Sequence, residues 1–308
     1  PDYWDPSQNR FKTGIVKLIP EPTTRVAALV AGDVDIINAV PPHLAKMVKS
    51  NPKLDLISGR SARTCYIIMP IKKGNPWYDV RVRKALNYAV DKKSIIKNIL
   101  QGHGKIVATN VGPTSFGHNP NLKPFTYDPA KAKKLLAEAG YAKGFSVDMY
   151  VPLGRYLMGK QAAEALAGQF AKVGLTVRVG TPEWGKLVKI MRPRWEPHSK
   201  PFWWYSCRMD SNLHAEGMFA GTIHSRSTWG GFKDKGIDKL TTDARSDLDD
   251  VKRLKKYQEI LRILRHEKVP LVFLWQMNQI NAKKKSIDWK MRSTAYMKLS
   301  DMGPKPQN

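Results

Sequence analysis

The sequence predicts an α/β fold, and three observations support this prediction. Apolar runs of strand length alternate with stretches whose apolar residues recur every three or four positions, as on one face of a helix. Glycines follow several of these helical stretches, as left-handed C-terminal residues do. The chain has 308 residues, 42% of them hydrophobic, which is enough to bury a core in one large domain or two.

The first part of the chain predicts short strands and three helices. Thr23 or Thr24 caps a first helix, which Gly32 closes. Asp79 and Asp91 begin two further helices. Strands are expected at residues 15–19, 33–37 and 65–69.

The middle of the chain begins with a long loop. Residues 102–125 are rich in Gly, Pro and Asn and show no periodicity, which indicates a functional or wrapping segment. Asp128 caps the next helix, with Pro129 at its first position and Gly140 at its end. A strand, a helix, a strand and a helix then follow, at 145–151, 158–173, 175–179 and 183–191.

The last third of the chain is less regular. Residues 192–232 are rich in aromatic side chains, and we expect this segment to be irregular. Asp249 or Asp250 caps the last long helix, and residues 269–275 form a buried strand. No run of 18 apolar residues occurs, which excludes a membrane-spanning helix.

The net charge is strongly positive: 52 Lys and Arg against 26 Asp and Glu give +26. A nucleic-acid binder would gather its basic residues on one element, whereas here they are spread along the whole chain. We therefore expect no nucleic-acid partner. Attraction to an anionic membrane surface or to an acidic ligand fits the charge equally well.

One segment of the chain comes close to a catalytic motif. Residues 154–161 follow the phosphate-binding loop pattern up to Gln161, which replaces the Ser or Thr that would hold Mg²⁺. Bulky side chains also fill this loop, so it suits a phosphate poorly. The HExxH, GxSxG and GxGxxG motifs do not occur. The chain is therefore not expected to be an enzyme.

A structural metal site is not expected from the sequence. His198, Cys207, His214 and His224 lie within one segment, but their spacing matches no standard structural zinc pattern, and scattered loop histidines are the preferred interpretation. Cys65 and Cys207 would pair in an oxidising compartment and stay buried thiols in a reducing one. The first residues lack both a signal peptide and an initiator Met, so we expect a processed or partial product.

Five strings in the chain carry a family resemblance. They are RVAALVAGDVD at 25–35, DVRVRKALNYAVD at 79–91, YDPAKAKKLLAEAGY at 127–141, GRY at 154–156 and AKVGL at 171–175. In this order they resemble the family 5 extracytoplasmic solute-binding proteins of ABC transporters, which bind dipeptides, oligopeptides or nickel. The resemblance extends from about Tyr3 to about Leu299.

The resemblance implies a periplasmic-binding-protein-like two-lobe fold, type II in its large family 5 form, with an incomplete first lobe. Residues 1–62 and 277–308 would belong to the first lobe, the latter with the tail, and 63–276 would form the second, α/β lobe. The chain would cross the hinge near Cys65 and Trp275. Closure about such a hinge buries a ligand between the lobes.

The resemblance also implies ligand-binding residues. Arg155 matches the position that grips the carboxylate of a bound dipeptide, and Tyr156 follows it. Trp204, Tyr205 and Asp210 match an aromatic and then acidic segment that meets the ligand's amino group and apolar parts. Ser206, Cys207 and Arg208 stand where peptide binders usually carry an acid, which favours an anionic or neutral ligand over a simple dipeptide. In some oligopeptide binders a disulfide joins the positions near Cys65 and Cys207, although the register at Cys207 differs by about two residues.

From these inferences we expect the solute-binding component of an ABC importer. It would capture a small molecule or short peptide, deliver it to the ABC permease, and need neither a cofactor nor a metal. It would act as a monomer in the periplasm or elsewhere outside the cytoplasm, associated with the membrane through the transporter. The alternatives are the same fold binding an oligosaccharide, an anionic solute or a nickel chelate, and, outside this class, a basic nucleic-acid binder or a P-loop enzyme.

Overall fold

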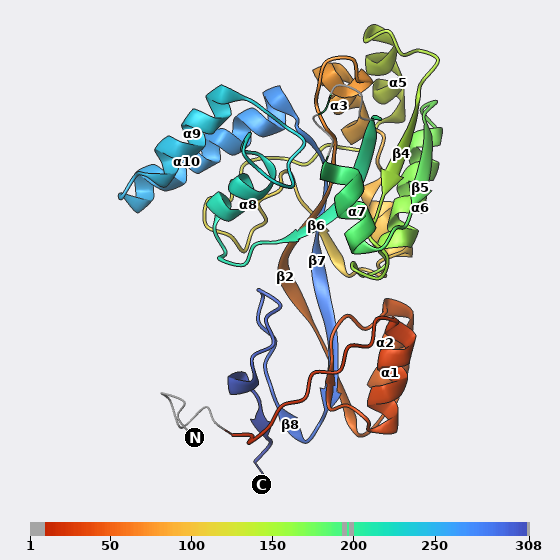
Figure 1. Ribbon diagram of the computed structural model, residues 1–308, viewed down its shortest axis with the longest axis vertical. Coiled ribbons are helices and arrows are strands. Elements are labelled where there is room, and N and C mark those ends of the chain that lie inside the picture. The colour runs from red at the N-terminus through yellow and green to blue at the C-terminus, as the bar shows by residue number, and fades with distance from the viewer. Residues whose placement is uncertain (1–9, 193–195, 197–199, 307–308) are drawn as a thin grey trace. The chain divides into compact units, whose positions relative to one another are not determined.

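The structure is a computed structural model that describes residues 10–192, 196 and 200–306 (Figure 1). The chain forms two compact units, one of Pro1–Ser61 with Asn278–Asn308 and the other of Ala62–Met277. Strands β2 (Leu54–Ile68) and β7 (Leu271–Lys284) each contribute residues to both units. The predicted α/β class is confirmed, while the assignment of the units to lobes of a binding protein stays a prediction.

The first unit packs two helices beside short strands. α1 (Pro22–Ala31) and α2 (Pro42–Ser50) flank β1 (Ile36–Ile37), which pairs antiparallel with β7. β8 (Ile287–Asp288) pairs antiparallel with β9 (Gly303–Pro304), after a short 3₁₀ turn at Leu299–Asp301. Arg10 anchors the chain here through an ion pair of 2.7 Å between its Nη1 and Asp288 Oδ2.

Two predictions for the first unit are wrong. Residues 15–19 form no strand: Ile15 is 81% exposed, and no described strand lies beside the segment to pair with it. The N-cap of α1 is Glu21 rather than Thr23 or Thr24. Pro22 occupies the first helical position, which needs no N–H donor, and the Glu21 carboxylate accepts the Thr24 N–H at 2.6 Å.

A mixed sheet forms the centre of the second unit. Its strands lie in the order β7, β2, β6, β4, β5, with β3 (Gly104–Ile106) pairing antiparallel with β7. β6 (Phe202–Met209) pairs antiparallel with β2 and parallel with β4 (Ser146–Tyr150), and β4 pairs parallel with β5 (Thr176–Gly180). Cys65 and Cys207 lie directly opposite in the β2–β6 register and are joined by a disulfide with Sγ–Sγ 2.03 Å.

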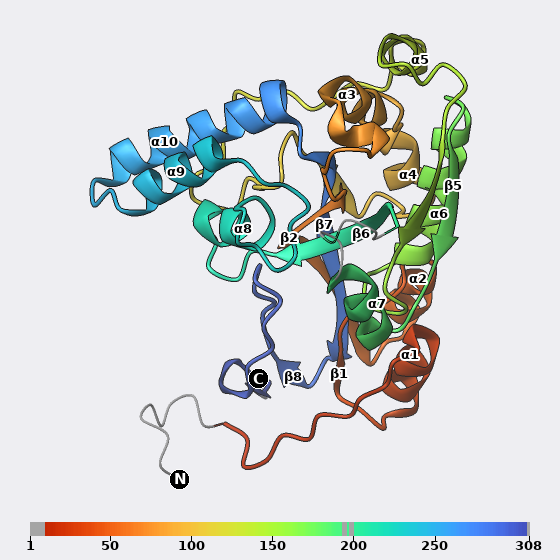
Figure 2. The same cartoon turned by 45° about the horizontal axis from the view of Figure 1, so that its top comes forward.

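Helices cover both faces of this sheet (Figure 2). One face packs on a 3₁₀ turn and four helices, Pro76–Tyr78, α3 (Val80–Tyr88), α4 (Lys92–Asn98), α5 (Pro129–Glu138) and α6 (Gly159–Ala171). The other face packs on α7 (Trp184–Met191), α8 (Ala215–Thr222), α9 (Lys235–Arg245) and α10 (Asp250–Ile263), which continues as a π-helical turn over Leu264–Lys268.

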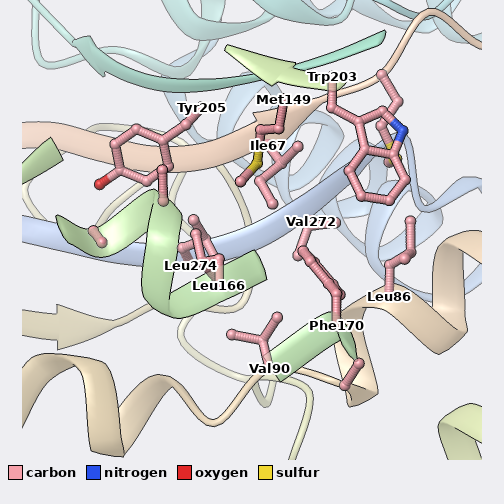
Figure 3. Packing of buried hydrophobic residues seen from close by; sticks show 14 of the residues in the cluster. Ile67, Leu86, Val90, Met149, Leu166, Phe170, Trp203, Tyr205, Val272 and Leu274 are labelled. Carbon is pink, nitrogen blue, oxygen red and sulfur yellow. The ribbon is translucent and has the colours of Figure 1, made fainter. Parts of the chain in front are cut away.

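Successive residues of the central strands pack into the hydrophobic cores on opposite faces of the sheet. On β6, Trp203 and Tyr205 pack on the α3–α6 side, whereas Phe202 and Trp204 pack on the α7–α10 side. This alternation follows from the two-residue period of a strand. Figure 3 shows Trp203 and Tyr205 pointing into one core with Leu166 and Phe170 of α6.

The helix starts at aspartates were predictable, but the aromatic segment was not. Asp79, Asp91, Asp128 and Asp249 cap their helices as predicted. The prediction that residues 192–232 are irregular is wrong, because they contain β6 and α8. A run of consecutive buried aromatics carries neither the alternation nor the helical spacing on which sequence patterns depend. Helices α2 and α9 were also not predicted.

A buried arginine joins α3 to the beginning of β7. Arg83 Nε donates to the carbonyls of Lys268 and Val269 at 3.1 and 3.0 Å, and Nη2 donates to Lys268 at 2.7 Å. Its Nη1 donates to the carbonyls of Trp77 and Tyr78 at 2.8 and 2.7 Å. The string DVRVRKALNYAVD at 79–91 therefore contains a residue with a structural role. The N–H groups of Arg83 donate to backbone carbonyls of residues outside α3.

Candidate functional site

A cavity of about 300 Å³ lies within the second unit, where β4 ends. β4 pairs with β6 only from Phe202 to Trp204, and the described residues place no further strand beside that edge of β6. The loop after β4, one side of α7 and the segment after α8 surround the exposed edge. Its lining combines three arginines with several aromatic side chains, namely Arg63, Arg155, Arg208, Tyr156, Trp184, Trp204, Tyr205 and Trp229.

Arg155 lies in the loop between β4 and α6, and its side chain is exposed. The guanidinium carbon sits 4.0 Å from the centroid of the Trp184 ring. Among the described residues, no carboxylate forms an ion pair with Arg155. A stacked guanidinium without a carboxylate partner keeps its N–H donors available for an incoming anion.

Arg63, which the sequence analysis did not select, lies at the same cavity. It projects from β2, donates from Nη1 to the Cys207 carbonyl at 2.7 Å, and its guanidinium carbon is 6.0 Å from the Tyr156 ring centroid. Burial lowers the pKa of Arg63, and the nearby positive charge of Arg155 lowers it further. No motif marks this residue, because strand pairing alone brings it to the site.

Arg208 lines the cavity from the opposite face of the sheet. It pairs in register with Thr64, so the two side chains share one face, and the preceding Arg63 projects from the other. Its guanidinium rests against Gly221 of α8, where any Cβ would overlap it. The Arg208 Nε is buried and has no hydrogen-bond partner among the described residues.

Tyr66 is a buried neighbour of Arg208. Burial raises the pKa of Tyr66 well above its usual range, and the positive charge of Arg208 acts in the opposite direction. The Tyr66 phenol therefore stays neutral beside Arg208.

The two adjacent aromatic candidates take different positions. Trp204 faces the cavity side with Trp184 and Trp229, whose rings lie 5.4 Å apart. Tyr205 borders the cavity, but its side chain is 0% exposed and packs 6.2 Å from the Trp275 ring, in the core shown in Figure 3. This burial makes Tyr205 part of the cavity floor rather than a surface that a ligand touches.

Asp210 is not among the residues that line the cavity. It is 2% exposed, and neither carboxylate oxygen has a hydrogen-bond partner among the described residues. It lies near the beginning of α8, where its charge raises the pKa of His214, although burial of that imidazole lowers the pKa more strongly. The carboxylate lies near Gly217, one turn of α8 away from the Gly221 that Arg208 contacts, and does not line the cavity.

The remaining candidates form no site in the described part of the chain. No group of three or more His, Cys, Asp or Glu there could hold a metal, Cys207 is in the disulfide, and His198 lies outside the described residues. Lys160 of the phosphate-loop-like segment points to solvent, with its Nζ 3.8 Å from Glu164 Oε1. A larger hollow of about 710 Å³ against α4 and β3 is open and offers lysines but no aromatic ring. Among the described residues, no helix is long and apolar enough to cross a membrane.

An α/β unit with a cationic, aromatic-lined cavity is typical of a domain that binds small organic solutes. The family described as "Bacterial extracellular solute-binding proteins, family 5 Middle" matches residues 1–214. The chain belongs to this family, which confirms the resemblance inferred from the sequence.

The relatives agree with this assignment. "Heme-binding protein A" of Haemophilus influenzae is 32% identical over 84% of this chain and 47% of its own length. "Dipeptide-binding protein" of Escherichia coli strain K12 is 29% identical over 88% of this chain and 51% of its own length. The chain thus spans about half the length of the curated relatives it matches.

Solved structures share the fold. The ABC transporter-associated periplasmic binding protein DppA from Helicobacter pylori, in complex with peptide STSA, superposes with a TM-score of 0.82 at 20% identity, covering 94% of this chain and 56% of that one. The agropinic acid complex of AgaA from A. tumefaciens R10 gives a TM-score of 0.79 at 25% identity, covering 94% of this chain and 60% of that one. These matches support the predicted fold of the periplasmic-binding-protein type.

Proposed function

We propose that this chain belongs to the solute-binding component of an ABC importer and captures a peptide-like ligand. Arg155 carries the proposal: it is an exposed guanidinium at the rim of a cavity, stacked 4.0 Å from the Trp184 ring centroid. The family membership and the peptide-binding relatives support the same function.

The chemistry of binding follows from the lining. A guanidinium receives a carboxylate through two parallel N–H···O bonds, which fixes the orientation of the ligand as well as its affinity. Stacking on Trp184 holds Arg155 in place before the ligand arrives, so less side-chain entropy is lost on binding. Trp229 offers a ring face for apolar groups of the ligand, and the buried Trp204 lies beneath the lining.

The biological setting is part of the proposal. A binding protein of this type acts outside the cytoplasm, in the periplasm or at the membrane surface, as a monomer. Closure of two lobes about a hinge would retain the ligand until it is delivered to the ABC permease. In this account the chain catalyses no reaction. An oligosaccharide or a nickel chelate is the alternative cargo for the same fold, and the exposed guanidinium of Arg155 favours a carboxylate over both.

The experiment compares a hydrophobic dipeptide that has a free C-terminal carboxylate with its C-terminal amide, by isothermal titration calorimetry on the full chain. We expect the acid to bind about 10- to 100-fold more tightly, because a hydrogen-bonded charge pair contributes about 1.5–3 kcal/mol. Arg155→Met should remove this preference. Lys133→Met, which removes an exposed charge on α5, should leave it unchanged. Equal binding of acid and amide, or an Arg155→Met variant that retains the preference, would contradict the proposal.

A further inference from the structure

Guanidinium groups reach the cavity from three different elements: Arg63 from β2, Arg155 from the loop after β4 and Arg208 from β6. No Asp or Glu is among its described lining residues. We propose that the ligand carries two separated acidic groups and no free ammonium, as an N-acylated peptide bearing a second carboxylate does. The inference rests on the proposed function, because it names the class of solute that this cavity would receive.

Two of the arginines form a first anion subsite. Arg63 is held by its 2.7 Å bond to the Cys207 carbonyl and lines the same cavity as Arg155. Burial lowers the pKa of Arg63, and the positive charge of Arg155 lowers it further. Two cations in a half-buried space repel each other unless an anion lies between them. A carboxylate bound there removes this repulsion, which adds to the bonds that it accepts.

Arg208 forms the second subsite. It projects from the face of the sheet opposite to Arg63, as the pairing of Thr64 with Arg208 requires. Gly221 and Tyr66 enclose its guanidinium, which fixes the group beside the cavity. The buried Nε has no hydrogen-bond partner among the described residues, so no carboxylate there neutralises the group. Arginines that project from two faces of a sheet are complementary to a ligand with two separated carboxylates.

An ammonium would meet only like charge in this cavity. Asp210, the carboxylate nearest in sequence to Arg208, is buried and outside the lining, so it makes no direct contact with a cationic end of the ligand. The overall charge of +26 adds a field that concentrates anions near the protein and repels cations.

The test uses a matched pair of probes, alanyl-phenylalanine and N-succinyl-alanyl-phenylalanine. The second replaces the ammonium by a carboxylate and leaves the rest of the peptide unchanged. Binding to the full chain is followed by tryptophan fluorescence, since Trp184, Trp204 and Trp229 line the cavity. We expect the succinyl derivative to bind about tenfold more tightly or better.

Variants assign the preference to Arg208. Arg208→Asp should abolish or reverse the preference, and Arg208→Gln, which keeps a polar side chain against Gly221, should reduce it. Lys133→Asp makes the same change in charge at an exposed site on α5 and should preserve it. Circular dichroism establishes that each variant is folded.

The outcomes separate the two proposals. If the free-amine peptide binds as tightly as the succinyl derivative, the ligand class is wrong while solute binding stands. A preference that persists in both Arg208 variants also overturns the assignment. If neither probe binds and the protein as purified releases no small molecule on denaturation, the proposed function fails and the inference fails with it.

Discussion

Lys92 places an ammonium-bearing side chain in the interior of the second unit. It is 3% exposed, and its Nζ donates to the carbonyls of Asn87 and Phe125 at 3.3 and 3.2 Å. Burial, with a smaller contribution from the charge of Arg265, lowers the pKa of Lys92 to about 7. Burial disfavours the charged form of an amine, which explains the direction of this shift.

This shift predicts a pH dependence of stability. Between pH 7 and the pKa of an unfolded lysine, about 10.4, the unfolded chain binds a proton that the folded chain has lost. The contribution of Lys92 to the free energy of unfolding should therefore rise with pH, by up to about 1.4 kcal/mol per unit. Urea unfolding from pH 7 to 9.5 measures it. In Lys92→Met the free energy of unfolding should no longer rise with pH in this way. Lys93→Met, which changes the exposed neighbouring residue, should retain the rise. If the free energy of unfolding changes with pH in the same way in Lys92→Met and in the wild type, the pKa of Lys92 is not shifted and the prediction is wrong.

At the level of single residues, the sequence predicts Arg155, Tyr156, Trp204 and Arg208 at what the structure describes as one cavity. It does not predict Arg63, which reaches the cavity through strand register, a property that depends on distant segments. It also cannot separate Trp204 from Tyr205. Neighbours on a strand face opposite sides, and only the packing of helices on both faces shows which core each ring joins.

At the level of elements, Arg83 makes α3 and the beginning of β7 depend on each other. Burial lowers the pKa of this arginine to about 10, and its hydrogen bonds to the described residues go to backbone carbonyls. Arg83→Met should lower the free energy of unfolding by about 2–4 kcal/mol, because several buried carbonyls lose their donors together. Arg81→Met, on the exposed side of the same helix, should cost less than about 1 kcal/mol.

Chemical denaturation of both variants, followed by circular dichroism, decides this prediction. If Arg83→Met is as stable as Arg81→Met, then water or a neighbouring donor satisfies the carbonyls, and the connection between α3 and β7 does not depend on the arginine.

Helices that begin at an aspartate were predictable because capping is local chemistry: one side chain accepts the N–H of a residue two or three positions later. Strand β6 was not predictable in the same way. Its first four residues, 202–205, are all aromatic and all buried, so no polar position marks one face of the strand there, and its pairing partners β2 and β4 lie far away in the sequence.

At the level of the whole molecule, the chain contains two units, and the cavity described above belongs to the second alone. The three arginines of the cavity account for only a small part of the net charge of +26. Its effect on an anionic solute is on the rate of encounter, which should fall as added salt screens the field.

The central claim is that the chain binds an organic solute, and native mass spectrometry of the protein as purified tests it most directly. We predict a complex heavier than the 34.8 kDa chain by the mass of a small organic acid, which denaturation releases as an anion. A released cation or zwitterion would contradict the ligand class. A spectrum that shows only the bare chain, unchanged after incubation with the succinyl probe, would contradict solute binding itself.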